Sequence, residues 1–173
     1  MTVDAEENDD RVSQPRRGGG ARTADGELDD VNLAIIEQLQ QDGRRSYAAM
    51  ASAVGLSEAA VRQRVQRLLE AGVMQIVAVT DPMRVGFKRQ AMIGVRVAGD
   101  TREVADALSQ LPEVDYVVLT AGSFDLIVEV VAEDDEHLLA LINGQIRALP
   151  QVRETESFVY LRLVKQTYTW GVR

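Results

Sequence analysis

Residues 54–74, VGLSEAAVRQRVQRLLEAGVM, decide the fold of the N-terminal part of the chain. Ser57 is a residue type favoured as a helix N-cap, and Gly72 is typical of the position just after a helix. Between them, Val61 and Val65 lie four residues apart and so share one face of a helix. The stretch therefore predicts a helix from Ser57 to the residue before Gly72, with one apolar face and one polar face.

Two more helices are predicted immediately before this one. From Leu28 onward, apolar residues recur along one helical stripe, and Gly43 stops the first helix that they predict. A second helix is expected from Ser46 to about Val54, where Gly55 breaks it. The N-terminal part of the chain is therefore expected to be a small unit of three short helices.

Three positions in these helices have the spacing of a helix-turn-helix. Ala51, Gly55 and Val61 are four and six residues apart in the sequence. In that motif a small residue lets two helices approach, and glycine adopts the left-handed turn conformation at low cost. The alternative is an ordinary three-helix bundle with a solvated polar face. Because arginines fill that face, we favour the helix-turn-helix.

The polar face of the third helix predicts a DNA-binding surface. A recognition helix enters the major groove by its N-terminal part, where arginine and glutamine have the donor geometry to read guanine and adenine. The candidates for contacts with base edges are Ser57, Glu58, Ala59, Arg62 and Gln63. The candidates for contacts with backbone phosphates are Arg44, Arg45, Arg64 and Arg67, with Ser46 on the same surface.

The charge of the chain is distributed in agreement with this surface. The net charge is −8, which by itself argues against nucleic acid. However, residues 43–75 carry five arginines against two glutamates, whereas residues 99–156 carry thirteen acidic residues against three arginines. Phosphate binding needs a local positive face, and an acidic second half stays away from DNA.

After Gly72 the spacing of apolar residues changes from that of a helix to the alternation of apolar and polar residues that is typical of a strand. We expect a linking strand over residues 74–81, which is ended by Pro82. Two similar units follow, and we predict strand 90–98, helix 101–111, strand 114–121, strand 124–132, helix 135–148 and strand 152–164. The order β-α-β-β-α-β is that of the ferredoxin-like split unit, so the fold class is α+β.

The faces of this sheet also follow from the sequence. Helices cover one face, and alternation over residues 124–131 predicts that Phe124, Leu126, Val128 and Val130 point into that core. The second face carries enough Val, Ile and Leu that we expect it to be buried against another subunit. The chain is therefore expected to form at least a homodimer.

Several classes of protein are disfavoured by composition. The chain has no cysteine, which excludes disulfides and thiolate zinc sites. No apolar run is long enough for a membrane helix, and the first ten residues do not resemble a signal peptide, so a cytoplasmic location is expected. We predict a flexible tail over 1–27, a helix-turn-helix domain over 28–73, a linking strand and loop over 74–88, an effector-binding and oligomerisation domain over 89–168, and a C-terminal tail over 169–173.

From Leu28 to Trp170 the chain resembles the Lrp/AsnC (feast/famine) family of transcriptional regulators. The similarity is carried by LDDVNLAIIEQLQQDGRRS (28–46), VGLSEAAVRQRVQRLLEAGVM (54–74), TDP (80–82), Gly86, PEV (112–114), AGSFD (121–125), LPQVRETES (149–157) and Lys165. The resemblance implies a winged helix-turn-helix, a linking strand and a ferredoxin-like ligand-response (RAM) domain. It also implies sequence-specific binding to double-stranded DNA, dimers that pair their sheets, and often octamers.

The resemblance further implies an effector site. Amino acids or related small molecules bind between dimers, near the glycine-x-x-aspartate turn. Carried over by position, the effector-binding residues are Gly122 and Asp125, with Thr120, Ser123, Thr155 and Ser157 nearby. A glycine–aspartate hairpin also makes a good turn without any ligand. The chain departs from the commonest family pattern at Asn32 and within the turn, at Ser123 and Phe124, and these changes bear on the identity of the effector.

Two other functions were weighed against a DNA-binding regulator. One is an effector-sensing oligomeric protein without DNA binding, which the complete helix-turn-helix argues against. The other is a decarboxylase-like enzyme on the same fold. The chain has a single histidine, His137, and no paired carboxylates or metal cluster can be assembled from the sequence. We therefore expect no catalytic residues, no metal and no cofactor other than an amino-acid-like effector.

Overall fold

The computed structural model describes residues 28–172, which form two compact units. The expected tail, residues 1–27, lies outside the described residues. One unit contains the residues up to Val77 together with the segment from Thr167, and the other runs from Ala78 to Gln166.

The first unit contains three helices, as predicted: α1 (Asp30–Gln41), α2 (Tyr47–Val54) and α3 (Glu58–Glu70). Each begins after a side chain that accepts a hydrogen bond from the backbone N–H three residues later. These N-caps are Asp29, Ser46 and Ser57. Gly55 ends α2 with φ of +71°, in the left-handed region that glycine adopts at low cost. Local sequence signals thus set the boundaries of all three helices.

The core of the first unit confirms the helix-turn-helix spacing. Ala51 is 6% exposed and Val61 is completely buried, on the two sides of the Gly55 turn. They pack in one cluster with Ile35 and Met50. Because this core uses only one face of α3, the opposite face of that helix stays at the surface.

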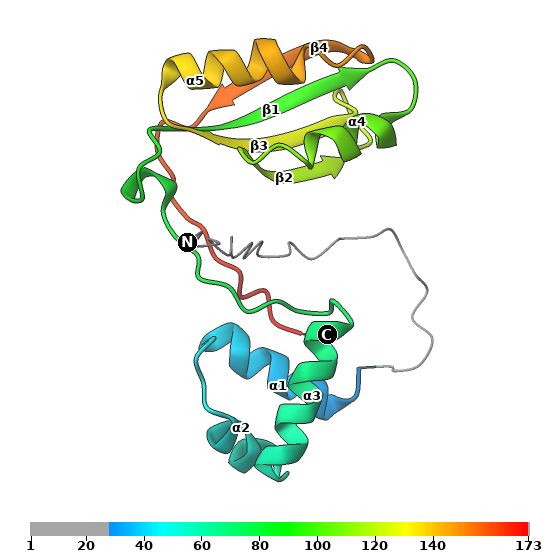
Figure 1. Cartoon of the computed structure of the whole chain (residues 1–173). Coiled ribbons are helices and arrows are strands. Elements are labelled where there is room, and N and C mark those ends of the chain that lie inside the picture. Colours follow the sequence, from blue (N-terminus) through cyan, green and yellow to red (C-terminus); the bar gives the residue numbers. More distant parts are fainter. Residues whose placement is uncertain (1–27, 173) are drawn as a thin grey trace, which may run out of the picture. The chain divides into compact units, whose positions relative to one another are not determined.

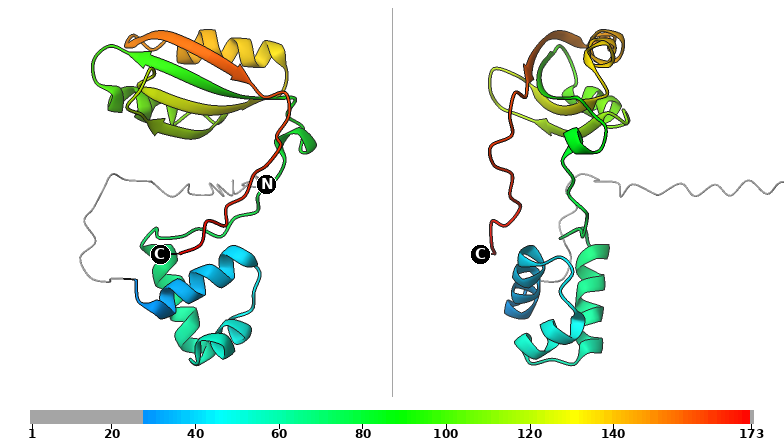
Figure 2. Two further views of the ribbon diagram at one scale, coloured as in Figure 1. Left: turned by 180° about the vertical axis from the view of Figure 1, so that it is seen from behind. Right: turned by 90° about the vertical axis from the view of Figure 1, so that its left-hand side faces the viewer.

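The second unit is a four-stranded antiparallel sheet with strand order β2-β3-β1-β4 (Figure 1). Its elements are a short 3-10 helix η1 (Pro82–Arg84), β1 (Arg89–Val97), α4 (Thr101–Leu108), β2 (Val114–Leu119), β3 (Leu126–Ala132), α5 (Asp135–Ala140), a π-helical segment η2 (Leu141–Ile146) and β4 (Val152–Val159). This order confirms the ferredoxin-like topology. Both α4 and α5 lie on the same face of the sheet (Figure 2).

The helix-covered face of the sheet forms the larger core. Its fully buried side chains include Ile93 and Val95 of β1, Val128 of β3, Leu108 of α4 and Leu141 of η2. Burying a Leu or Ile side chain of this size stabilises a fold by about 1.5–3 kcal/mol. No helix of residues 78–166 packs on the opposite face of the sheet, and Tyr116 and Phe158 there keep close to half of their surface exposed.

The predicted linking strand over 74–81 is not formed. Among residues 28–172, no other segment forms strand hydrogen bonds with it. A β-strand needs such a neighbour, because its backbone N–H and C=O groups must be paired with another strand. The last strand is also shorter than predicted and ends at Val159. Alternation in a sequence marks residues suited to a strand, but pairing needs a second segment at the right place.

The second helix of the sheet domain was predicted as one regular helix over 135–148. Instead, α5 ends at Ala140 and continues as the π-helical segment η2. The backbone N–H of Arg147 donates to the carbonyl of Ile142, five residues earlier, at 2.9 Å. Insertion of such a wider turn is typical of π-bulges. Among residues 28–172, no helix is both long and apolar enough to cross a membrane.

The prediction that Phe124 points into the helix-covered core is wrong. Strand β3 begins only at Leu126, so the alternation does not extend back through the preceding turn. Phe124 lies over Gly94 on the opposite face, where its ring makes an edge-on contact with Phe158 at 6.4 Å between centroids. The turn before β3 reverses the direction in which this side chain points.

Candidate nucleic-acid interface and effector turn

The exposed face of α3 presents the polar side chains that the sequence singled out. Arg62, Gln63, Gln66 and Arg67 are all exposed, and they line one shallow depression along the helix together with Ala59 and Glu70. Gln66 donates to the carboxylate of Glu70 at 2.8 Å. The surface therefore offers hydrogen-bond donors along about one and a half helical turns, and such donors can reach base edges from a helix in the major groove.

Arg62 contacts two other side chains on this face. Its guanidinium lies 4.7 Å above the ring centroid of Tyr47, the first residue of α2. It also forms an ion pair with Glu58, with 3.0 Å between Nη2 and Oε1. The side chain is thereby held between two helices. Tyr47 was not among the sequence candidates, although an aromatic residue directly after the Ser46 cap was the signal that marked it.

The loop before α2 brings two further arginines to the start of α3. Arg44 and Arg45 line one hollow together with Ser46, Tyr47 and Glu58. Arg44 is exposed, and its backbone N–H donates to the Asp42 carboxylate at 2.9 Å, which fixes the loop. The structure thus brings the loop arginines close to the N-terminal part of α3, although the whole of α2 lies between them in the sequence.

The hydroxyls of Ser46 and Ser57 are engaged within the protein. Ser46 accepts from the backbone N–H of Ala49 and Ser57 accepts from that of Ala60, both at 3.2 Å. These contacts make them N-caps, and each hydroxyl still has a proton to donate. The position of Ser57 at the positive end of the α3 dipole is suited to an anion such as a phosphate.

Arg64 lies apart from this surface. Its Nη1 donates to the Asp29 carboxylate at 2.6 Å and to the Asn32 side-chain carbonyl at 2.9 Å, and only 27% of its side chain is exposed. The pKa of Asp29 lies below its usual value, mainly because its carboxylate accepts a hydrogen bond from the backbone N–H of Asn32. The hydrogen bond from Arg64 lowers it further. Arg64 therefore joins α3 to α1, and we leave it out of the proposed phosphate contacts.

The glycine-x-x-aspartate turn is closed by its own hydrogen bonds. The Asp125 carboxylate accepts from the backbone N–H of Val97 at 2.8 Å. The Thr120 N–H donates to the Asp125 carbonyl at 2.9 Å, and the Thr120 hydroxyl donates to the carbonyl of Phe124. Gly122 lies at the exposed tip of the turn. These contacts give Asp125 a clear structural role in fixing the turn against β1.

Arg96 belongs to the same turn and was missed by sequence reasoning. Its Nε donates to the carbonyl of Ser123 at 2.8 Å, its Nη1 pairs with Glu154 at 3.0 Å, and its guanidinium lies 5.4 Å from the Phe124 ring centroid. The signal in the sequence was a single arginine within an apolar strand. The side of the turn that faces the open sheet therefore carries a cation and an aromatic ring.

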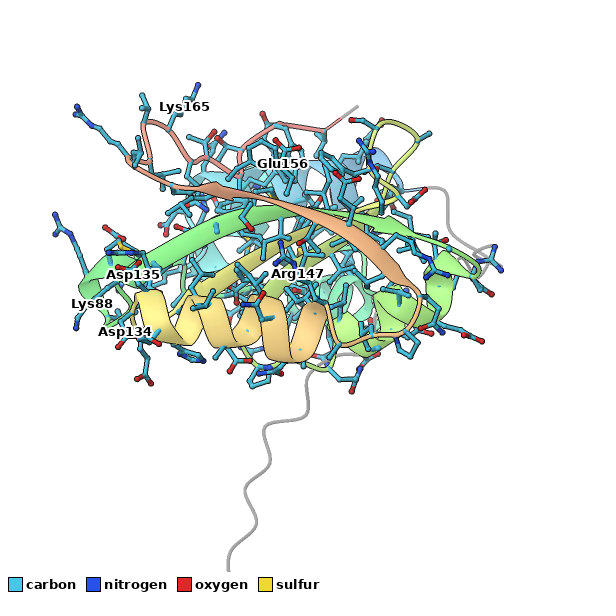
Figure 3. All side chains as sticks on the ribbon, turned by 90° about the horizontal axis from the view of Figure 1, so that it is seen from above. Lys88, Asp134, Asp135, Arg147, Glu156 and Lys165 are labelled. Carbon is cyan, nitrogen blue, oxygen red and sulfur yellow. The ribbon has the colours of Figure 1, made fainter. Side chains whose placement is uncertain are left out.

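Thr155 and Ser157 lie elsewhere. They are on β4, opposite Val95 and Ile93 of β1 in the register, and so on the helix-covered side of an edge strand. The Thr155 hydroxyl accepts from Nε of Arg147 at 2.7 Å. Arg147 follows η2 and is labelled beside the helix of α5 and η2 in Figure 3. Within one chain, the structure groups Thr120, Gly122, Ser123 and Asp125 in one turn but does not bring the two β4 hydroxyls to it.

The open face of the sheet carries a row of polar groups among its apolar side chains. Gln90 donates to the Glu129 carboxylate at 2.9 Å. Asp115 lies at the bulge of β2, and its pKa is raised above the ordinary value. Partial desolvation is the larger cause and the negative charge of Glu129 is the smaller one. Desolvation and a hydrogen bond to Glu129 raise the pKa of Tyr160 to about 12. The hydroxyl of Tyr160 therefore stays protonated as a donor at neutral pH.

His137 has a structural place at the start of α5. Its Nδ1 accepts from the backbone N–H of Glu133 at 3.3 Å, and its Nε2 lies 3.2 Å from the Glu113 carboxylate. This arrangement requires the tautomer with the proton on Nε2. Among residues 28–172, no three acidic or histidine side chains are grouped so that they can hold a metal ion.

Comparisons with known families agree with these two units. Residues 28–69 match the AsnC-type helix-turn-helix domain. Residues 87–173 match a C-terminal dimeric alpha+beta barrel domain of AsnC-type regulators. Together the two matches cover most of the chain. The first match falls within the helical unit, and the second covers the sheet unit from residue 87 and continues into the segment from Thr167 that is grouped with the helices.

Individual relatives are transcriptional regulators. The chain is 31% identical over 147 residues to an uncharacterised HTH-type transcriptional regulator of Pyrococcus abyssi, covering 84% of this chain and 90% of the relative. It is 33% identical to the proline dehydrogenase transcriptional activator of Rhizobium radiobacter, covering 82% and 94%. Its structure resembles the L-Met complex of transcriptional regulator NMB0573 from Neisseria meningitidis, with a TM-score of 0.72, 26% identity, and coverage of 84% and 97%.

Proposed function

Because the chain belongs to the Lrp/AsnC family of HTH-type transcriptional regulators, we propose that it binds specific DNA sequences through α3 and that an amino acid or similar metabolite modulates this binding. The observation that carries the proposal is the face of α3 with Arg62, Gln63 and Arg67, flanked by the loop arginines. The family consists of regulators, so the chain is a regulator and not an enzyme. Such a regulator is located in the cytoplasm, where it binds the chromosome.

The contacts divide into two kinds by their chemistry. Arg62 and Gln63 lie on the first two turns of α3, which enter the major groove and reach base edges. Arg44, Arg45 and Arg67 are placed around them and contact phosphates, which position the protein without reading sequence. Each phosphate contact adds about one unit to the negative slope of log affinity against log salt concentration.

The active unit is a homodimer, because one helix-turn-helix reads only half of a site. The matching C-terminal domain is that of a dimeric barrel. The open face of the sheet is suited to this contact, since Met92, Tyr116, Val118 and Phe158 leave apolar surface there. Dimers can join further into a tetramer of dimers. The dimer sets the spacing of two recognition helices and hence the spacing of two half-sites.

The effector site lies at the turn of Thr120, Gly122, Ser123 and Asp125, completed by a neighbouring subunit. The L-Met complex of a structural relative supports an amino acid as the class of effector. The exposed tip at Gly122 leaves its backbone open to a ligand carboxylate, while Asp125 keeps the turn in shape. An effector shifts DNA binding only as far as it prefers one assembly over another.

The function is tested by selection of binding sites from genomic fragments, followed by titrations over a salt series. We expect enrichment of sequences with two related half-sites and a steep negative salt slope. Arg67→Ala and Arg44→Ala should each reduce the slope by about one unit and weaken binding to all sequences alike. Binding that neither depends on salt nor enriches any sequence would contradict the proposal.

A further inference from the structure

We infer that Tyr47 and Glu58 hold the guanidinium of Arg62 in one orientation for reading a guanine, which makes Tyr47 a specificity-determining residue of the operator contact. The inference deepens the proposed function and rests on it. Tyr47 belongs to α2, whereas the sequence candidates for contacts with base edges all lie on α3 or at its N-cap.

The position of Tyr47 is fixed by the fold. It is the first residue of α2, directly after the Ser46 cap, and its side chain packs partly against the helical core. It is therefore only partly exposed, and its ring has little freedom to move. The Arg62 guanidinium lies 4.7 Å from the ring centroid, within the range of about 6 Å in which a cation is attracted to an aromatic face.

Glu58 supplies the second restraint. It lies one helical turn before Arg62 on α3, and its Oε1 is 3.0 Å from Nη2. The aromatic ring and the carboxylate thus restrain the guanidinium through two separate contacts, one from α2 and one from α3. Among the described contacts of residues 28–172, the remaining donors of Arg62 have no partner. Because 63% of the Arg62 side chain is exposed, these donors are accessible to a ligand.

This arrangement favours a base over a phosphate. The Glu58 carboxylate cancels the charge of Arg62 and repels a nearby phosphate, so the pair contributes little to general attraction for DNA. A planar fork with a fixed direction matches the O6 and N7 acceptors of guanine, which is the commonest specific arginine contact in the major groove. Arg67 differs, because its Nε has only a long 3.5 Å contact with the carbonyl of Gln63.

The test compares five variants on operators found by selection from randomised DNA. Tyr47→Leu removes the aromatic face but keeps an apolar side chain, and Tyr47→Phe is its matched control. Glu58→Ala removes the carboxylate from an exposed position. Arg62→Lys keeps the charge without the fork, and Arg67→Ala is the control for a phosphate contact. The readouts are base preference at each operator position, the salt slope and the melting temperature.

We expect the wild type to prefer guanine at one position in each half-site, and Arg62→Lys to lose roughly 10-fold or more of that preference. Tyr47→Leu and Glu58→Ala should each lose about 3-fold at the same position. The salt slope should stay unchanged in Tyr47→Leu and become steeper in Glu58→Ala, because the charge of Arg62 is then no longer compensated. Tyr47→Phe should keep the preference. Arg67→Ala should lower the slope and leave the base preference as it is.

Unchanged base preference in a folded Tyr47→Leu variant would overturn the inference while the DNA-binding function stands, and unchanged preference in Glu58→Ala would remove Glu58 from it. The inference is also overturned if Arg62→Lys keeps the guanine preference. A wild type without sequence-selective, salt-dependent binding would overturn the proposed function together with the inference. If the melting temperature shows that Tyr47→Leu is unfolded, Glu58→Ala and Arg62→Lys decide the question, because both positions are exposed.

Discussion

The guanidinium of Arg64 lies 2.6 Å from the carboxylate of Asp29, so the middle of α3 is tied to the N-cap of α1. The same nitrogen also donates to the side chain of Asn32. This network lies at the partly exposed contact between α3 and α1, and Arg64 does not line the depression that contains Arg67. It explains how the recognition helix keeps its orientation on the rest of the domain.

Arg64→Ala should therefore act on stability and not on phosphate binding. We expect a lower melting temperature of the helix-turn-helix unit, because the Asp29 charge loses its partner. The slope of log affinity against log salt should change by less than half a unit, whereas Arg67→Ala should change it by about one unit. Salt-series titrations of both variants check this. A slope reduction in Arg64→Ala equal to that of Arg67→Ala would return Arg64 to the phosphate contacts.

The stability of this network should depend on pH. The pKa of Asp29 is lower in the folded protein than its ordinary value of 3.8. Its contribution to the free energy of unfolding is therefore present above pH 3.8 and is lost as the pH falls through the folded pKa. Asp29→Asn keeps an N-cap side chain but lacks the charge. We expect it to be less stable than the wild type at pH 7 and to approach it below pH 3.8. Urea unfolding at several pH values tests this, and a difference independent of pH would contradict it.

Asp115 should show the opposite dependence. Desolvation and the neighbouring Glu129 raise its pKa above 3.8, so the folded state holds its proton more strongly than the unfolded state. Its contribution to stability is present below pH 3.8 and is lost as the pH rises through the raised pKa. We expect Asp115→Asn to unfold at a higher urea concentration than the wild type at pH 7, and at a similar one in acid. Equal midpoints at both pH values would show that the two carboxylates do not interact.

Asp125→Ala should destabilise the sheet domain as well as alter effector response. The carboxylate accepts the backbone N–H of Val97, and loss of such a charged hydrogen bond costs about 1.5–3 kcal/mol. Asp125→Asn should keep most of the stability because its side-chain carbonyl still accepts. Both variants should bind operator DNA as dimers with wild-type affinity. Chemical unfolding measures the stability, DNA titration measures the affinity, and light scattering with added amino acids measures the effector response. If Asp125→Ala were as stable as the wild type, the Asp125 carboxylate would not have the structural role described above.

Gly94→Ala should disturb the turn through Phe124. A Cβ at position 94 would lie 2.6 Å from the Phe124 ring, which is too close for any contact. The ring must move, and overpacking of this kind typically costs about 1–3 kcal/mol. The double variant Gly94→Ala/Phe124→Ala should show a smaller loss than the sum of the two single variants. Additive losses in the unfolding free energy would mean that the two residues do not touch.

The helices and the topology of the sheet were predictable because their signals are local. Caps such as Ser57, the glycine after α2 and the spacing of Val61 and Val65 act within a few residues of chain. The order of strands and helices then leaves few ways to build a connected sheet, and the ferredoxin-like arrangement is one of them. The α3 candidates for DNA contacts followed for the same reason, since helical period alone separates the two faces of a helix.

What the sequence by itself determined was therefore the class of each unit, its helices and the polar face of α3. Tertiary structure decided which partner each side chain meets. Arg64 pairs with Asp29 across 35 residues, and Phe124 crosses to the open face because the chain turns before β3. Residues 74–81 have strand composition but pair with no strand among the described residues 28–172. These outcomes depend on which segments the fold brings together, and a local pattern contains no information on the distance between residues far apart in the chain.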